Sequence, residues 1–417
     1  MKLTITGIQN IAISYVALWA TSPFLAFGEV YRLAAVISVL VWAGLELQRA
    51  ESIFYKPTLP VLLTLVYISY TATIQFMLEG AASLVLHFQI WIMLFFLIVQ
   101  QSRRNDPLSL KMVFWVVLVT MPIWLFLTFD TLVSENSHAA RLAVRASEEA
   151  EELANKGVGG YALVYASILL FPSLLMFLLS KAKGESFFRN HIFKSLPRSA
   201  RWIVFLNILL VLLVVFTAGY SIAVITFLLS TLCAFILKKY SFSRVMAIFM
   251  MGLVVATVFQ PFMEALLTAL LPLAEGTNFA VKIKDLLDSL QVGDAVGSAA
   301  ERVERYTRSL TLFFENPLIG VLAVDDVGKH SQILDAYARW GIFFGCIFVY
   351  LLVFLPIKLL KKPQNNFGCV MAVLVSALSV FILNNGFSAA GLMLYIMFPV
   401  AYQFILDSKR LNFRAAG

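Results

Sequence analysis

Charged residues are scarce in this sequence. They make up 13% of its 417 residues, whereas soluble globular domains carry about 25%. Hydrophobic residues make up 60%, and many apolar runs reach the roughly 15–20 residues that cross a bilayer as a helix. The composition argues against a soluble domain and predicts an all-α, polytopic membrane protein that forms a single transmembrane domain over residues 1–417.

Cysteines and familiar catalytic motifs are also scarce. The 3 cysteines, Cys233, Cys346 and Cys369, lie in apolar runs, which indicates buried thiols rather than a disulfide framework or a metal site. The sequence has no P-loop, no HExxH and no G-x-S-x-G. No Asp-x-Asp pair suits a metal-bound nucleotide sugar, and the adjacent Asp325 and Asp326 offer few oxygen ligands. We expect neither a metal nor a cofactor.

The apolar runs predict about twelve membrane spans. The first is long enough to remain as a helix, so we expect no cleaved signal peptide. In the tenth span, Gly341 and Gly345 form a small-xxx-small pair, which favours close helix packing. The spans are predicted near residues 8–27, 31–48, 58–78, 82–101, 109–128, 160–180, 202–218, 220–237, 243–272, 332–359, 367–385 and 389–406.

The distribution of basic residues explains the net charge of +8 without a nucleic-acid partner. With twelve spans, most basic residues fall on the side of the N-terminus, which the positive-inside rule identifies as the cytoplasm. Both termini are then cytoplasmic, and two long polar segments, 129–159 and 273–331, face outward. The basic residues on the cytoplasmic side are Arg49, Lys56, Arg103, Arg104, Lys111, those of the stretch 181–201, Lys238, Lys239, Arg244, Lys358, Lys361, Lys362, Lys409, Arg410 and Arg414.

The first outward segment has helical character. Arg141 and Arg145 are four residues apart and share one face of a helix. They either form ion pairs on a solvated helix, for example Arg145 with Glu149, or face an anionic ligand.

The second outward segment predicts two helices. Residues 279–290 carry an apolar stripe, which favours an amphipathic helix on the outer membrane boundary. The second predicted helix begins near residue 300 and ends before Pro317. Arg302, Arg305 and Arg308 lie within about 120° of arc around its axis. The second and third arginines each follow a glutamate by four residues and can form surface ion pairs. Arg302 has no such partner, so it is the preferred residue for an external anion.

The tenth span begins in an unusually charged stretch. Ser331 is a predicted N-cap, and Asp335 lies near the first turn, where a carboxylate suits the helix dipole. Arg339 follows Asp335 by four residues and can pair with it. His330 is either an ordinary structural histidine or a functional one, since it lies outside the membrane beside a helix start and close to the arginine helix.

These residue types suit one kind of chemistry. Arginine donates paired hydrogen bonds to phosphate oxygens and stabilises the charge of a departing phosphate. Histidine accepts a proton from an attacking hydroxyl near neutral pH. The combination predicts glycosyl transfer from a lipid pyrophosphate at the outer face, a reaction that needs no ATP because the donor is already activated.

The order and spacing of these residues resemble the O-antigen polymerase and O-antigen ligase superfamily. Its members typically have an arginine four residues before an aromatic residue, then N-P-x-x-G, then His-Asn or His-Ser at the next helix. The matching positions are Arg302-x-x-x-Tyr306, Glu315-Asn316-Pro317-x-x-Gly320, His330-Ser331-x-x-Leu334-Asp335 and Gly341. This resemblance covers about forty residues, and the number of spans and the long late outer loop extend it over the chain.

The resemblance implies a GT-C-like, metal-independent glycosyltransferase. It acts on undecaprenyl-pyrophosphate-linked glycans at the periplasmic face of the bacterial inner membrane, among membrane lipids. Arg302 is implied to contact the pyrophosphate and His330 to serve as the base or to position the acceptor. Further candidates for the anion site are Arg305, Arg308, Arg141, Arg145 and Arg339.

One departure concerns a Ser-Arg-Gly that many relatives carry at the outer end of a middle span. The sequence here reads Ala218-Gly219-Tyr220-Ser221, so another arginine must take that role. Together with the Gly157–Tyr161 stretch, this turn is more similar to the polymerases, which join two lipid-linked glycans, than to the ligases, which transfer the glycan to lipid A core. A flippase or transporter is a third hypothesis, which ionisable residues near mid-membrane would favour. They are sparse here, with only Glu46 and Glu264 within or near spans.

Overall fold

The protein is helical throughout the part that the structure describes. The computed structural model describes residues 4–136, 138–143, 147–179, 198–237, 268–272, 298–322, 327–360 and 367–415, with isolated positions between 280 and 287. The first half contains α1 (Ile5–Thr21), α2 (Pro23–Phe27), α3 (Glu29–Leu47), α4 (Leu59–Glu79), α5 (Ala81–Ser102), the 3-10 helix η1 (Pro107–Leu110), α6 (Lys111–Ser134), α7 (Ala139–Leu142) and α8 (Glu148–Asn155). The second half contains α9 (Tyr161–Leu179), α11 (Arg198–Thr217), α12 (Ser221–Ile236), α15 (Ser298–Glu315), α16 (Gln332–Val349), the π-helix η3 (Tyr350–Phe354), α17 (Leu355–Lys358), α18 (Phe367–Leu383), α19 (Ser388–Leu392), the π-helix η4 (Met393–Met397) and α20 (Phe398–Ala415).

The helices confirm a membrane-embedded helical protein. In the described part, 7 helices are long and apolar enough to cross a membrane, and three shorter apolar helices accompany them. The predicted spans other than 243–272 fall on helices, and those near 8–27, 332–359 and 389–406 each cover more than one helix. That span lies almost entirely outside the described residues, as does the predicted amphipathic helix 279–290.

The first predicted span, 8–27, is wrong as a single helix. α1 ends at Thr21, and α2 starts at Pro23 after the N-cap Ser22, whose hydroxyl accepts a hydrogen bond from the Leu25 amide at 3.2 Å. Proline lacks an amide hydrogen and suits the first turn of a helix, so the sequence Ser-Pro starts a new helix here.

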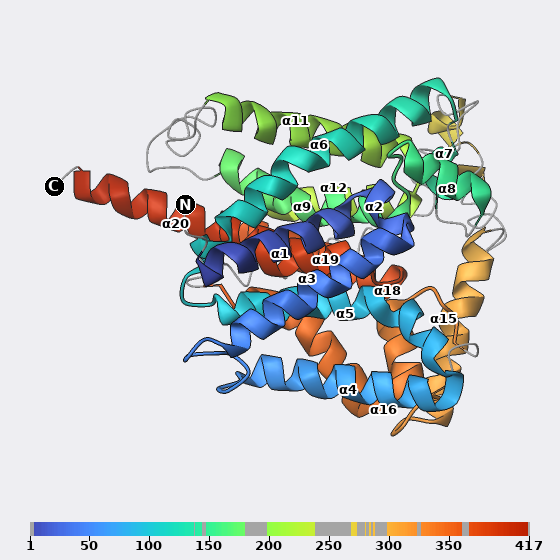
Figure 1. Cartoon of the computed structure of the whole chain (residues 1–417). Coiled ribbons are helices and arrows are strands. Elements are labelled where there is room, and N and C mark those ends of the chain that lie inside the picture. Colours follow the sequence, from blue (N-terminus) through green and yellow to red (C-terminus); the bar gives the residue numbers. More distant parts are fainter. Residues whose placement is uncertain are drawn as a thin grey trace.

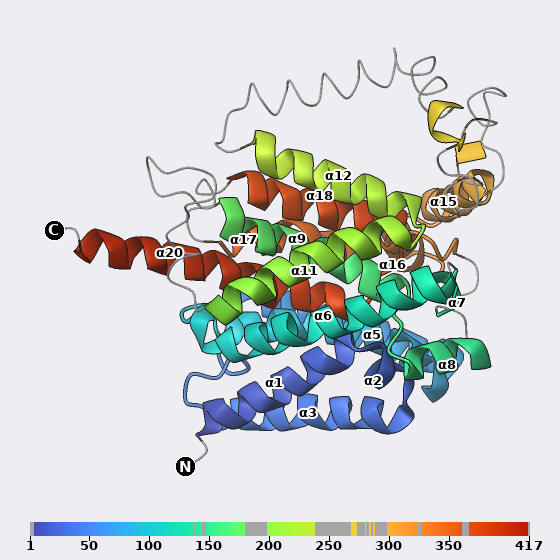
Figure 2. The same ribbon diagram turned by 90° about the horizontal axis from the view of Figure 1, so that it is seen from above.

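Two helical runs form the centre of the protein. In α9 and in the run Ser388–Leu406, 83% of a membrane-length window is buried, against 17% in α3. α3 instead exposes large apolar side chains, including Val30, Leu33 and Leu40, as expected for a face in contact with lipid. Around the centre, α1 packs on α3, α6 on α11 and α12 on α18 (Figure 2).

The two ends of the helices differ. Figure 1 places α7, α8 and α15 together at one end, which we call the α15 end, and both termini toward the opposite end.

A buried polar network joins α1, α3 and α5 at that opposite end. Gln9 Nε2 and Arg49 Nη1 donate to Glu46 Oε2, each at 3.0 Å, and Ser102 Oγ donates to Oε1 at 2.8 Å. Arg103 Nη2 donates to Gln9 Oε1 at 2.6 Å. Glu46 is therefore held by structural hydrogen bonds.

α16 breaks at Gly341, and a neighbouring segment repairs the break. Gly341 has φ 70° within an otherwise helical run. A backbone break at membrane depth is tolerated only where other groups satisfy the freed amides and carbonyls. The segment that follows α15 supplies three bonds: Val321 N to Ala338 O at 2.9 Å, Leu322 N to Arg339 O at 3.0 Å, and Ile342 N to Pro317 O at 2.8 Å.

The predicted role of Gly341 and Gly345 in packing two spans together is wrong. A Cβ at Gly341 would lie 2.1 Å from the carbonyl oxygen of Leu318, so this glycine admits the segment after α15. A Cβ at Gly345 would lie 2.4 Å from the ring of Tyr337 in the same helix. The small-xxx-small pattern failed as a predictor because Gly341 makes room for the segment after α15 and Gly345 makes room for the Tyr337 ring of its own helix.

Replacing Gly341 by alanine should destabilise the protein. The left-handed backbone at this position is expected to cost about 1–3 kcal/mol of unfolding free energy for any other residue, and the added methyl group overlaps the Leu318 carbonyl. Thermal unfolding in detergent measures the loss. Gly44→Ala is the matched control, because Gly44 lies in α3 with no atom within 4 Å of the new Cβ. Equal melting temperatures for the two variants would contradict the role of the kink.

Candidate functional site

α15 carries the predicted arginines across the α15 end of the protein. The predicted helix before Pro317 is confirmed, since α15 ends at Glu315 and packs on α16. Arg302 is half-buried, whereas Arg305 and Arg308 are exposed. The three predicted residues therefore differ in their surroundings, although they share one helix.

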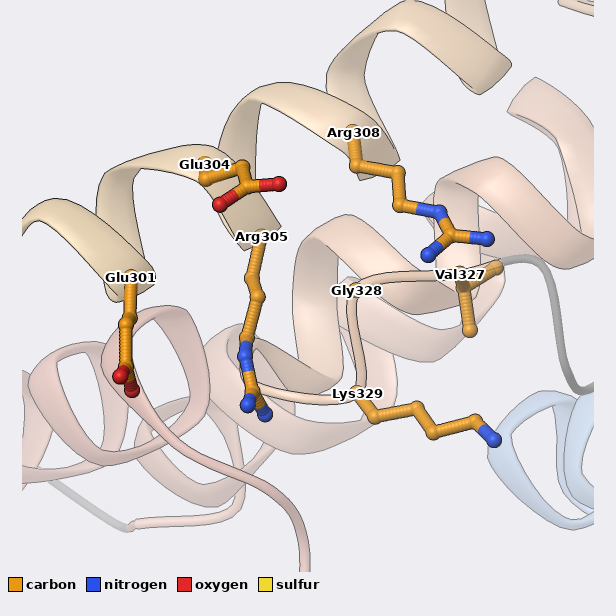
Figure 3. A pocket seen from close by; sticks show the side chains of 7 residues that line it. All are labelled: Glu301, Glu304, Arg305, Arg308, Val327, Gly328 and Lys329. Carbon is orange, nitrogen blue, oxygen red and sulfur yellow. The ribbon is translucent and has the colours of Figure 1, made fainter.

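The ion pairs expected between these arginines and the preceding glutamates do not form. Among the described residues, the observed ion pairs involve Arg49 and Lys156 instead. Figure 3 shows the ends of the Glu301 and Arg305 side chains apart. An exposed ion pair contributes little free energy, and Arg305 binds another partner.

Arg305 binds the predicted histidine. Its Nη1 lies 3.0 Å from His330 Nε2. A guanidinium has no lone pair to offer and can only donate, so Nε2 must accept. This contact therefore requires a neutral His330 with its proton on Nδ1.

The surroundings of His330 keep it neutral. Burial is the largest cause that lowers its pKa, followed by the positive charges of Arg305 and Arg302. Glu301 acts in the opposite direction, more weakly. His330 is thus an unprotonated base near neutral pH. Its basic nitrogen, Nε2, already accepts a hydrogen bond from Arg305.

Hydrogen bonds fasten the His330 loop to α15 and α16. Asp335 Oδ1 accepts from Ser309 Oγ at 2.6 Å, and that hydroxyl oxygen accepts from Gly328 N at 3.0 Å. Ser331 is the predicted N-cap of α16, and Asp335 Oδ2 also accepts its backbone amide at 3.4 Å. A Cβ at Gly328 would lie 2.0 Å from the carbonyl oxygen of Arg305, so only glycine allows this approach.

Arg302 offers an unsatisfied donor. Its Nη1 is buried without a hydrogen-bond partner in the described part of the chain. It interacts electrostatically with Tyr161, Tyr165 and His330. An unpaired buried donor is destabilising, and more so when it is charged. An anionic oxygen at this position would relieve that cost.

The turn after α18 binds the start of α9, α15 and the loop that precedes His330. Tyr161 at the start of α9 donates from its hydroxyl to Asn385 O at 2.5 Å, and Tyr306 on α15 donates to Leu383 O at 2.9 Å. Asn385 Nδ2 donates to Lys329 O at 2.8 Å, directly before His330. The turn thereby sets the distance between Arg302, the tyrosines and His330.

Arg141 reaches the same region from the first outward segment. Its Nη2 donates to Gly219 O at 2.6 Å, and Tyr220 donates from its hydroxyl to Ala140 O at 2.7 Å. The rings of Tyr220 and Tyr165 lie 6.1 Å apart. Arg141 is therefore connected through tyrosines to the surroundings of Arg302.

A pocket of about 350 Å³ opens between α15 and the loop that precedes His330, and neither His330 nor Arg302 lines it. Lys329 has φ 58°, a left-handed conformation that is uncommon for a residue other than glycine and that marks a constrained loop. Figure 3 shows Arg305 extending from α15 past this loop. The lining residues are Glu301, Glu304, Arg305, Arg308, Val327, Gly328 and Lys329.

The remaining predicted residues lie elsewhere. Arg339 is about two and a half helical turns beyond His330 along the chain, with its guanidinium 4.6 Å from the ring of Trp340. It acts on Asp335 electrostatically, and that carboxylate accepts hydrogen bonds from the Ser309 hydroxyl and from the backbone of Ser331 and Lys329. Arg145, Asp325 and Asp326 lie outside the described residues.

The sequence reasoning missed several residues of this site. Tyr165 and the pair Asn384 and Asn385 were not singled out, although the Asn384 side chain interacts with Tyr165 and Asn385 binds Tyr161. The two adjacent asparagines, placed between apolar runs, were the sequence feature that could have indicated this part of the site. Tyr165 gave none, because a tyrosine within an apolar helix looks like an ordinary core residue.

The arrangement offers a base, fixed cations and phenol groups at one surface. In the described ranges, His, Cys, Asp and Glu side chains do not gather in threes as a metal site requires. Comparison of the chain with family models, curated proteins and solved structures finds no match.

Removing Arg305 should raise the pKa of His330. In the wild type, burial, Arg305 and Arg302 favour the neutral ring, so His330 gains its proton only below its ordinary range as the pH falls. Arg305→Gln removes one of these charges and moves protonation to higher pH. NMR titration of protein labelled at histidine nitrogen measures the change. Arg308→Gln is the control, and an equal rise in both variants would show only a general loss of charge.

Proposed function

We propose that this chain is a glycosyltransferase that takes its glycan from an undecaprenyl-pyrophosphate donor at the α15 end. The observation that carries the proposal is Arg302, with a buried and unpaired Nη1 beside the Arg305–His330 pair. A pyrophosphate supplies the anionic oxygens that such a cation requires. The resemblance of residues 302–345 to the O-antigen polymerase and ligase superfamily supports the same assignment.

In this proposal Arg305 has two partners in turn. Without substrate, it donates to His330 Nε2 and occupies the base. A bound pyrophosphate competes for the guanidinium, since a phosphate oxygen is a stronger acceptor than a neutral imidazole. The same event frees Nε2, so the base becomes available only when the donor is present.

The chemical step is a single displacement. The acceptor hydroxyl gives its proton to His330 Nε2 while its oxygen forms a bond to the anomeric carbon of the donor sugar. The bond from that carbon to the phosphate oxygen breaks, and undecaprenyl pyrophosphate leaves with the electron pair. Arg302 and Arg305 stabilise the charge that develops on the leaving group.

Arg141 is proposed as the arginine that this chain uses in place of the one in the family's Ser-Arg-Gly turn. Its guanidinium contacts the turn at Gly219, where the sequence lacks that arginine. Its contribution is secondary, because one of its nitrogens is engaged by a carbonyl.

A polymerase is preferred over a ligase. Both would use the same donor site, and they differ in the acceptor, which is a second lipid-linked glycan or lipid A core. The Gly157–Tyr161 stretch favours the polymerase because its tyrosine belongs to the site, with its hydroxyl bonded to Asn385. The transporter hypothesis is weaker, since Glu46 is engaged by Gln9, Arg49 and Ser102.

The proposal also fixes an orientation. The α15 end faces the periplasm, both termini lie in the cytoplasm, and the chain crosses the bacterial inner membrane about twelve times. Arg49, Lys56, Arg104 and Lys358 then lie at the cytoplasmic ends of their helices, as the positive-inside rule expects.

Reconstituted protein tests the reaction directly. Wild-type protein supplied only with undecaprenyl-pyrophosphate-linked repeat units should produce a ladder of longer lipid-linked chains on a gel. Arg302→Gln and His330→Gln should each lower the rate by about 10²–10³-fold, because they remove charge stabilisation and the base. Arg32→Gln removes a charge from α3, outside this site, and should leave the ladder intact.

The acceptor distinguishes the candidates. Transfer that occurs only after lipid A core is added would identify a ligase. Wild-type rates in both site variants, with the protein still in the membrane, would overturn the assignment of Arg302 and His330.

A further inference from the structure

A second cationic pocket lies at the end of the helices opposite the α15 end. It has a volume of about 540 Å³ and opens where the α3–α4 connection, the end of α5 and α17 meet. Lys56, Arg104 and Lys358 each contribute a side chain to its wall. All three are exposed, so a ligand can reach them from the membrane surface.

The charges of this pocket have one sign. Its lining residues in the described structure include three cations and no carboxylate. Lys56, Arg104 and Lys358 come from segments far apart in the sequence, so the fold concentrates their like charges around one cavity. Like charges held together repel one another, and a bound anion offsets that repulsion.

Several residues of the pocket wall contact one another. Thr58 Oγ1 donates to Gln101 Oε1 at 2.9 Å, and Gln101 Nε2 donates to Gln100 Oε1 at 2.9 Å. Lys358 Nζ lies 5.8 Å from the centre of the Tyr350 ring, within the range of a cation–π contact. The first contact joins the start of α4 to α5, and the last joins α17 to η3 within one helical run.

The rest of the lining is apolar. Leucine and proline side chains complete the wall, and Leu59 remains 62% exposed at the start of α4. A purely soluble anion would gain nothing from such groups, whereas a lipid places its glycerol and acyl carbons beside them. The apolar lining residues are Pro57, Leu59, Pro60, Leu355 and Leu359.

We propose that this pocket binds the phosphate-bearing headgroup of an anionic phospholipid. Arg104 supplies a planar fork that matches phosphate oxygens, and the two lysines supply further positive charges. Basic pockets between membrane helices bind anionic headgroups in this way. The apolar lining favours a lipid over free phosphate, which offers the same anionic chemistry. This inference does not depend on the proposed glycosyl transfer, because the two pockets lie at opposite ends of the helices.

Lipid titration of the purified, delipidated protein tests the site. Native mass spectrometry in neutral detergent compares binding of phosphatidylglycerol with that of phosphatidylcholine, and we expect preference for the first. Lys56→Gln, Arg104→Gln and Lys358→Gln should each weaken phosphatidylglycerol binding about fivefold, the effect of one cation at a lipid surface. The control is Lys111→Gln, which removes an exposed charge at the same end but outside the pocket lining.

The outcomes separate the possible ligands. Equal phosphatidylglycerol binding by the three pocket variants and Lys111→Gln would overturn the site. A second arm replaces the lipid with inorganic phosphate at constant ionic strength and measures thermal unfolding. Stabilisation by phosphate equal to that by phosphatidylglycerol would assign the pocket to a soluble anion and overturn the lipid proposal.

Discussion

The repaired break in α16 is the constraint on which the candidate site depends. Backbone groups inside a membrane must find partners within the protein, and the break at Gly341 leaves such groups free. In the segment after α15, the amides of Val321 and Leu322 donate to freed carbonyls of α16, and the carbonyl of Pro317 accepts from the Ile342 amide. Because that segment continues directly from α15, this docking also fixes the arginine helix over the start of α16. His330 and Arg305 meet as a consequence.

The His330 loop then becomes a rigid connection between two helices. Ser309 on α15 and Asp335 on α16 hold it through Gly328. The geometry imposes a protonation state, since Arg305 can only donate to Nε2. Arg305 and Arg302 also lower the pKa of His330, and under the proposed function a bound pyrophosphate would draw Arg305 away from Nε2.

The sequence predicted several residues of the candidate site but not the partners that they contact. Arg302 was chosen because it lacks a glutamate four residues before it, and the structure leaves its Nη1 without a partner in the described part. For Arg305 the sequence left open an ion pair with Glu301 or an anion contact, and in the structure it donates to His330. Arg339 interacts electrostatically with Asp335, four residues before it, and its guanidinium also lies over Trp340. Helical spacing predicts which side chains share a face, but not which of them a distant loop will reach.

The sequence by itself determined the helical membrane class, because 60% hydrophobic residues in runs of membrane length permit few alternatives. It also determined the end of α15 before Pro317 and the N-cap at Ser331, because both depend on local hydrogen bonding. Only the tertiary structure decided that Tyr161 lies near Arg302 and that Tyr161 and Tyr306 both donate to the turn after α18. Their contacts join residues more than seventy positions apart along the chain, and no periodicity within one helix encodes such a distance.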